Sequence, residues 1–113
     1  MVNDLICSEG ASILEVLQIY NKNAERIVFV VDKEEKLKGV ISEGDIRRAL
    51  IKGTELHTAV GSLLSPNFVF VKEGTPFEEI IKKTNERIRF VPIVNDDFKV
   101  IDFVQYDSRI YLP

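Results

Sequence analysis

The chain has 113 residues, of which 45% are hydrophobic and 29% charged, and its formal net charge is −3 at pH 7. That balance is typical of a folded globular protein, and the length allows one compact domain or two small associated halves. A negative net charge argues against nucleic acid or an acidic membrane as a partner, because both require a basic surface. Any site for an anion must therefore be local.

Cysteine content and the absence of long apolar stretches indicate the compartment. The single cysteine, Cys7, excludes an internal disulfide, is typical of a reducing cytoplasm and is predicted to be a small core residue. No apolar run is long enough to span a membrane, and MVNDLICSEG lacks the basic and apolar regions of a signal peptide. We predict a cytoplasmic protein with no membrane partner.

Two stretches of the chain resemble each other at an offset of about 63 residues. They are EGASILEVLQIYNKNAERIVFVVD over 9–32 and EGTPFEEIIKKTNERIRFVPIVN over 73–95. Each opens on Glu-Gly, passes through a helix-like stretch, and then enters a branched apolar strand after an arginine. The repeat predicts two copies of one supersecondary unit that pack together.

The first copy predicts a helix, two strands and a second helix. The first helix is indicated by apolar residues at helical spacing: Ile13, Leu14, Leu17 and Tyr20. The run IVFVV over 27–31 predicts a strand buried on both faces, and KEEK a hairpin turn into a returning strand over 37–41. The second helix follows Ser42 and ends by Gly53.

The second copy predicts the same order. Thr75 is expected to cap a helix that opens on Pro76. Its inward side chains are expected to be Phe77, Ile80 and Ile81. Strands are expected over 88–94 and 99–104, followed by a short segment from Gln105. The segment TELHTAVGSLLSPN between the copies is expected to hold a short packed helix, and we divide the chain into repeats 1–53 and 54–113.

The motif GVISEGD, directly after a Val-Val-Asp hairpin in VVDKEEKLKGVISEGD, together with VPIVN in the second half, resembles a tandem pair of CBS domains. The resemblance covers essentially the whole chain. It implies an α/β (α+β) fold of two pseudo-symmetric βαββα repeats packed sheet to sheet, with clefts between them that bind adenosine nucleotides. It also implies that Asp45 binds a ribose and Ser42 a phosphate.

Physical chemistry agrees with this assignment. A strand-to-helix junction at Ser42 offers unpaired N–H groups to a phosphate, and a carboxylate such as Asp45 can accept both hydroxyls of a ribose. Gly39 would allow close backbone approach, Val40 and Ile41 would line a base pocket, and one of Arg47 and Arg48 would point to the phosphate. The candidate ligand-binding residues are Gly39, Val40, Ile41, Ser42, Asp45, Arg47, Arg48 and Asp107.

Two interpretations stay open at the motif, because Ser-x-x-Asp is also close to the helix capping box. The second copy departs from the motif. Aligned by the hairpin, Ile101 stands opposite Gly39 and Val104 opposite Ser42, while Asp107 matches Asp45. We expect at most one competent cleft.

No other pattern predicts chemistry. His57 is expected to be an ordinary solvated or hydrogen-bonded residue, no cluster has metal-ligand spacing, and no nucleophile–base pair is present, so neither catalysis nor a metal or cofactor is expected. Two functions remain. One is a regulatory module that binds a nucleotide and modulates an attached or partner enzyme. The other is a structural dimerisation module without ligand. The stretches DIRRALIKG and SLLSPNFVFV resemble CBS pairs that precede sugar-nucleotide enzymes, which implies a sugar nucleotidyltransferase or sugar aminotransferase as the enzyme of such a module. The resemblance to CBS pairs also implies a homodimer, and a catalytic domain after Pro113 would suit either function.

Overall fold

The computed structural model describes residues 2–111, without the side chains of 110 and 111, and the chain divides into two compact units at Phe68 and Val69. The first unit contains a 3-10 helix Val2–Leu5, β1 Ile6–Ser8, α1 Ile13–Lys22, β2 Ile27–Val31, β3 Leu37–Ser42, α2 Glu43–Ile51 and a 3-10 helix Val60–Leu63. The second contains β4 Val71–Lys72, α3 Phe77–Lys83, β5 Phe90–Val94, β6 Val100–Gln105 and a 3-10 helix Ser108–Tyr111. The predicted βαββα order is therefore present in the first unit, and a 3-10 helix replaces the last helix in the second.

Each unit has one three-stranded sheet with the same topology. The orders are β1-β2-β3 and β4-β5-β6, and in each sheet the first pair is parallel and the second pair is an antiparallel hairpin. All five residues of the central strand β2 are buried, as its continuous run of branched and aromatic side chains predicted. The prediction of one supersecondary unit repeated twice is confirmed.

The two hairpins repeat each other in atomic detail. The side chain of Asp32 accepts hydrogen bonds from the N–H groups of residues 34 and 36, and Asn95 accepts the same bonds from residues 97 and 99. Glu35 and Phe98 occupy the same left-handed backbone conformation, with φ of 65° and 61°. Each pair is separated by 63 residues, so the predicted offset holds across the hairpin.

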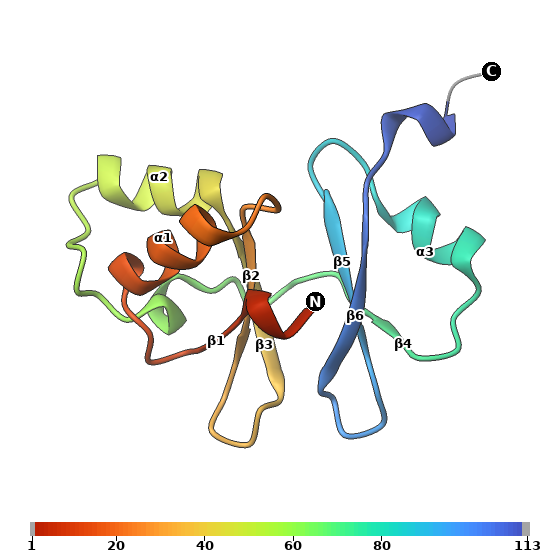
Figure 1. Ribbon diagram of the computed structural model, residues 1–113, viewed down its shortest axis with the longest axis horizontal. Coiled ribbons are helices and arrows are strands. Elements are labelled where there is room, and N and C mark those ends of the chain that lie inside the picture. Colours follow the sequence, from red (N-terminus) through yellow and green to blue (C-terminus); the bar gives the residue numbers. More distant parts are fainter. Residues whose placement is uncertain (1, 112–113) are drawn as a thin grey trace. The chain divides into compact units, whose positions relative to one another are not determined.

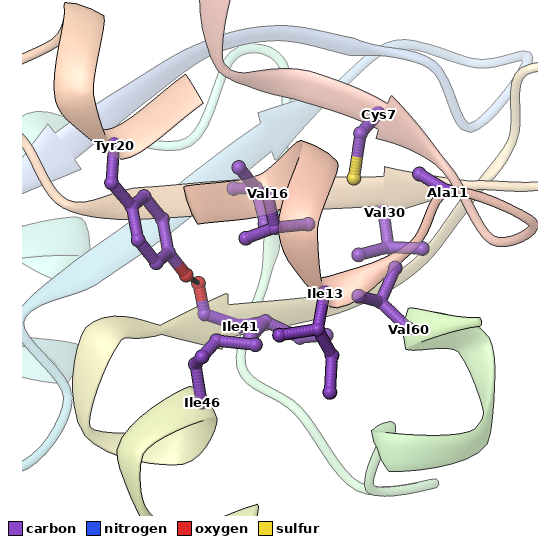
Figure 2. Close-up of a cluster of buried hydrophobic side chains, with 10 residues drawn as sticks. Cys7, Ala11, Ile13, Val16, Tyr20, Val30, Ile41, Ile46 and Val60 are labelled. Atoms are coloured by element: carbon purple, nitrogen blue, oxygen red, sulfur yellow. Dashed lines mark hydrogen bonds between the residues drawn. The ribbon is translucent and has the colours of Figure 1, made fainter. Parts of the chain in front are cut away.

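In the first unit, α1 and α2 cover one face of the sheet (Figure 1). Figure 2 shows the buried cluster between these helices and the sheet, which is formed by Cys7, Ala11, Ile13, Val16, Tyr20, Val28, Val30, Ile41, Ile46 and Val60. Cys7 is a core residue as predicted, and burial raises the pKa of its thiol to about 11, with a smaller contribution from Glu15. Of the four residues that indicated the first helix, Leu14 is 48% exposed, whereas Val16, which was not among them, is buried in the core.

The segment after α2 packs on the first unit. The carbonyls of Leu56 and Thr58 accept the N–H groups of Leu14 and Ile13 at 3.0 Å, which satisfies donors that the first turn of a helix leaves free. Gly61 allows the segment to approach the chain before α1 closely, because an added Cβ would lie 2.9 Å from the carbonyl oxygen of Glu9. These bonds place residues 54–68 with the first compact unit. The short helix expected in this segment is confirmed as the 3-10 turn at Val60–Leu63.

The second unit differs from expectation at its helix. Pro76 is the N-cap of α3, and no side chain caps this helix within residues 2–111. Thr75 does not cap, because its hydroxyl donates to the carbonyl of Lys72 at 2.7 Å in the preceding turn. Phe77 is 57% exposed, while Ile80 is buried as predicted. Among the described residues, no helix has both the length and the apolar character needed to cross a membrane.

Candidate functional site

The junction between β3 and α2 is built by a reciprocal capping box. Ser42 is the last residue of β3, with extended backbone, and α2 begins at the next residue. Its hydroxyl oxygen accepts the N–H of Asp45 at 3.3 Å, and Asp45 Oδ2 accepts the N–H of Ser42 at 2.9 Å and its hydroxyl at 3.0 Å. The capping interpretation of Ser-x-x-Asp is therefore confirmed. The cap also fixes Asp45 at the positive end of a helix dipole.

A buried hydrogen bond from Tyr20 stabilises this junction. Its hydroxyl donates to the carbonyl oxygen of Ile41 at 2.9 Å in the buried cluster, one residue before Ser42 (Figure 2). Burial raises the pKa of the Tyr20 phenol above its ordinary value, and the charge of Asp45 adds to that effect. The phenol therefore stays protonated and ties the end of β3 to α1.

The two arginines of the motif have different partners. Arg48 Nη2 donates to Asp45 Oδ1 at 2.7 Å, so the capping box and Arg48 together engage both carboxylate oxygens. Arg47 lies 3.7 Å from Glu43, whose carboxylate also accepts a hydrogen bond from Arg26 at 3.0 Å. The expectation that helical geometry separates the two arginines agrees with this arrangement, and Arg48 is the one beside Asp45.

The three β3 residues before Ser42 lie on alternate faces. Ile41 is 1% exposed in the cluster beneath the helices, and Gly39 is buried on the same face. An added Cβ at Gly39 would lie 2.7 Å from Leu64, so the close approach at this glycine is made by a side chain of the same unit. Val40 is half-buried on the opposite face, beside Phe29.

The register of the second sheet corrects our alignment of the two copies. Ile27 pairs with Ser42 and Val30 with Gly39, while Phe90 pairs with Gln105 and Ile93 with Asp102. The counterparts of Gly39 and Ser42 are thus Asp102 and Gln105, and not Ile101 and Val104. The glycine and the hydroxyl are absent from the second copy in either alignment.

Asp107 is consequently the counterpart of Gly44, and Ser108 takes the place of Asp45. Both carboxylate oxygens of Asp107 accept hydrogen bonds from Arg109, at 3.0 Å and 2.8 Å. The side-chain hydrogen bond from Arg109 lowers the pKa of Asp107 to about 2. In the second copy, therefore, the charge of Asp107 is paired with that of Arg109, and no capping box is formed there among the described residues.

A groove between α1 and α2 was not predicted. Its volume is about 520 Å³, and it is lined by Leu17, Tyr20, Asn21, Arg26, Glu43, Ile46, Arg47, Leu50 and Ile51. Arg26, one of the lining residues, has a left-handed backbone conformation, with φ of 57°. The sequence could have indicated Arg26 as a candidate, because an arginine directly precedes the central strand in both copies, at positions 26 and 89.

His57, as expected, is an exposed residue with a neighbouring acid. Its Nε2 lies 3.2 Å from the carboxylate of Glu55, and 81% of its side chain is exposed. In the part of the chain that the structure describes, no three His, Cys, Asp or Glu side chains gather as a metal site would require.

Comparison with known proteins identifies the family. The sequence matches the CBS domain family over residues 1–52 and 60–105, so the chain belongs to that family and carries a tandem pair. The crystal structure of the CBS domain pair of protein MJ0100, in complex with 5′-methylthioadenosine and S-adenosyl-L-methionine, is 26% identical with a TM-score of 0.79. That match covers 95% of this chain and 86% of the other.

Other relatives are longer. The magnesium transporter MgtE of Thermus thermophilus is 29% identical over 106 residues, which cover 88% of this chain and 22% of the transporter. The structure of the cytosolic domain of the Mg²⁺ channel MgtE in complex with ATP has a TM-score of 0.77 at 25% identity, over 95% of this chain and 44% of that one. Arabinose 5-phosphate isomerase GutQ of Salmonella typhimurium is 26% identical over 94 residues, 80% of this chain and 29% of the isomerase. The chain thus spans less than a third of the length of the curated relatives it matches.

Proposed function

We propose that the chain is a regulatory module that binds an adenosine nucleotide at the β3–α2 junction of its first repeat and modulates an attached or partner enzyme. The observation that carries the proposal is the group of Ser42, Asp45 and Arg48 at one helix N-terminus. It combines a hydroxyl and helix N–H groups for a phosphate, a carboxylate for ribose hydroxyls, and a guanidinium. Relatives of known structure hold adenosine derivatives, namely 5′-methylthioadenosine, S-adenosyl-L-methionine and ATP.

The proposal predicts different behaviour for two substitutions of Ser42. Ser42→Ala should lower the free energy of unfolding by about 0.5–2 kcal/mol, because it removes a helix cap. Ser42→Asp keeps a capping oxygen but brings a second carboxylate against that of Asp45, so it should recover only part of that stability, and it would also repel a bound phosphate. We therefore expect AMP to raise the melting temperature of the parent and not that of Ser42→Asp, in thermal-shift measurements on both proteins.

Ser12 supplies a matched control, because it caps α1 through the same capping box with Glu15. Ser12→Asp should keep the AMP-induced rise in melting temperature. A stable Ser42→Asp protein that shows the parent's rise would argue that Ser42 only caps the helix. Absence of a rise in the parent with AMP, ADP and ATP would remove the proposed function and leave a structural module.

A homodimer through the α1–α2 groove is the second part of the proposal. Ile51 is 78% exposed and lines the groove. A two-fold interface brings one surface against itself, so it favours a patch with both charge signs, as Glu43, Arg26 and Arg47 provide here. Such a dimer would also serve the alternative function of a ligand-free module that holds catalytic domains together.

We expect light scattering to find a dimer at tens of micromolar protein. Ile51→Glu should raise the dissociation constant of that dimer by more than about tenfold, because a charge would be buried in an apolar contact. Leu56→Glu is the control, since Leu56 is 46% exposed but does not line the groove. A monomeric parent, or equal effects of the two substitutions, would contradict this interface.

A further inference from the structure

The carboxylate of Asp45 already accepts almost all the hydrogen bonds that it can accept, within the described chain. It accepts the N–H and the hydroxyl of Ser42 on Oδ2 and the guanidinium of Arg48 on Oδ1. A carboxylate has about four lone-pair sites, so one is left. The two hydroxyls of a ribose present two donors. A nucleotide can use Asp45 for both hydroxyls only if one of the present donors leaves.

Arg48 is the donor that leaves at the lower cost. Its side chain is 64% exposed, and ion pairs between exposed side chains contribute little to stability. The N–H of Ser42, by contrast, belongs to the backbone at the start of α2 and cannot move without undoing the cap. The Ser42 hydroxyl can rotate, so it is the competing candidate.

Gly44 leaves room for the guanidinium of Arg48 at the start of the helix. An added Cβ at Gly44 would lie 3.2 Å from Arg48 Nη1, so the guanidinium lies across the first turn of α2 over this glycine. That turn carries the N–H groups and the dipole that attract an anion. The guanidinium therefore already lies on the surface where the phosphate of a nucleotide is expected.

We propose that Arg48 covers Asp45 in the ligand-free chain and moves from Asp45 to the ligand's phosphate when a nucleotide binds. This inference rests on the proposed function and adds its specificity. A nucleotide replaces the ion pair that its ribose breaks, because the phosphate takes the guanidinium. A nucleoside breaks the same ion pair and offers no anion in return. Arg48 thus selects phosphorylated ligands over nucleosides.

The test compares AMP with adenosine by calorimetry on the full chain. Arg48→Gln should weaken AMP binding roughly tenfold, because a charge-assisted contact to the phosphate is lost. The same substitution should strengthen adenosine binding about threefold, because Asp45 is uncovered. Arg48→Lys keeps a cation and should retain most of the preference for AMP. Lys52→Gln, which removes one charge at the far end of α2, should change both affinities by the same small factor.

The readout is the ratio of the two affinities, which a merely structural role of Arg48 would not move. An unchanged ratio in Arg48→Gln overturns the inference while leaving nucleotide binding intact, and is the result expected if the Ser42 hydroxyl yields instead. A parallel loss of AMP and adenosine binding also overturns it, because Arg48 would then only hold Asp45 in place. A parent that binds neither compound overturns both the inference and the proposed function.

Discussion

Replacement of Ile46 by alanine is expected to lower the free energy of unfolding by about 2–5 kcal/mol, the range for an isoleucine truncated in a core. Ile46 is 1% exposed and lies in the buried cluster that joins α2 to the sheet (Figure 2). The loss is large relative to the total stability of a small domain, which is about 5–15 kcal/mol. It should be seen in urea denaturation as a lower midpoint at an unchanged slope.

Ile51→Ala is the matched control for this prediction, because it makes the same change on the same helix at a position that is 78% exposed. Its effect should stay within about 0.5 kcal/mol. A second series at lower protein concentration separates any contribution of a dimer to either value. Equal losses for the two substitutions would mean that α2 is not anchored through Ile46.

Patterns that depend on burial and on the local turn were readable from the sequence. The run IVFVV predicted the bounds of β2 and its burial on both faces, because only a strand covered on both sides has no polar position. The side chain of Ser42 and its spacing to Asp45 predicted that a helix starts there, and the observed capping box confirms this prediction. Ile80 was likewise predicted to be inward.

Features that depend on tertiary contacts were not readable. Leu14 and Phe77 fit helical spacing as well as Val16 and Ile80 do, and only the position of the sheet decides which side chains it covers. Residues 54–68 belong to the first unit through backbone bonds to residues 9–14, and backbone bonds carry no side-chain signature.

The candidate site was predicted in part. The group of Ser42, Asp45 and an arginine was expected, and the i,i+3 spacing on α2 places Arg48 rather than Arg47 beside Asp45. The error at Asp107 came from matching one aspartate to another, whereas the equal length of the two hairpins sets the register one residue later.

Asp45→Ala is expected to weaken AMP binding by about 1.5–3 kcal/mol, the range for lost hydrogen bonds to a charged group. We had expected little change in stability, but Asp45 completes a capping box and pairs with Arg48, so a loss of about 1 kcal/mol in unfolding free energy is expected as well. Asp107→Ala should matter much less for binding, because Arg109 neutralises Asp107 and the second copy lacks the serine cap.

Calorimetric titration of AMP into the parent, Asp45→Ala and Asp107→Ala tests the central claim most directly, since it asks whether the first repeat holds a nucleotide through its β3–α2 junction. All three proteins are measured at a temperature where denaturation curves show them folded, which removes the stability loss of Asp45→Ala from the comparison. The account predicts one site in the parent, a site weakened more than about tenfold in Asp45→Ala, and near-parent affinity in Asp107→Ala. Equal affinities in Asp45→Ala and Asp107→Ala, or no heat of binding in the parent, would contradict it.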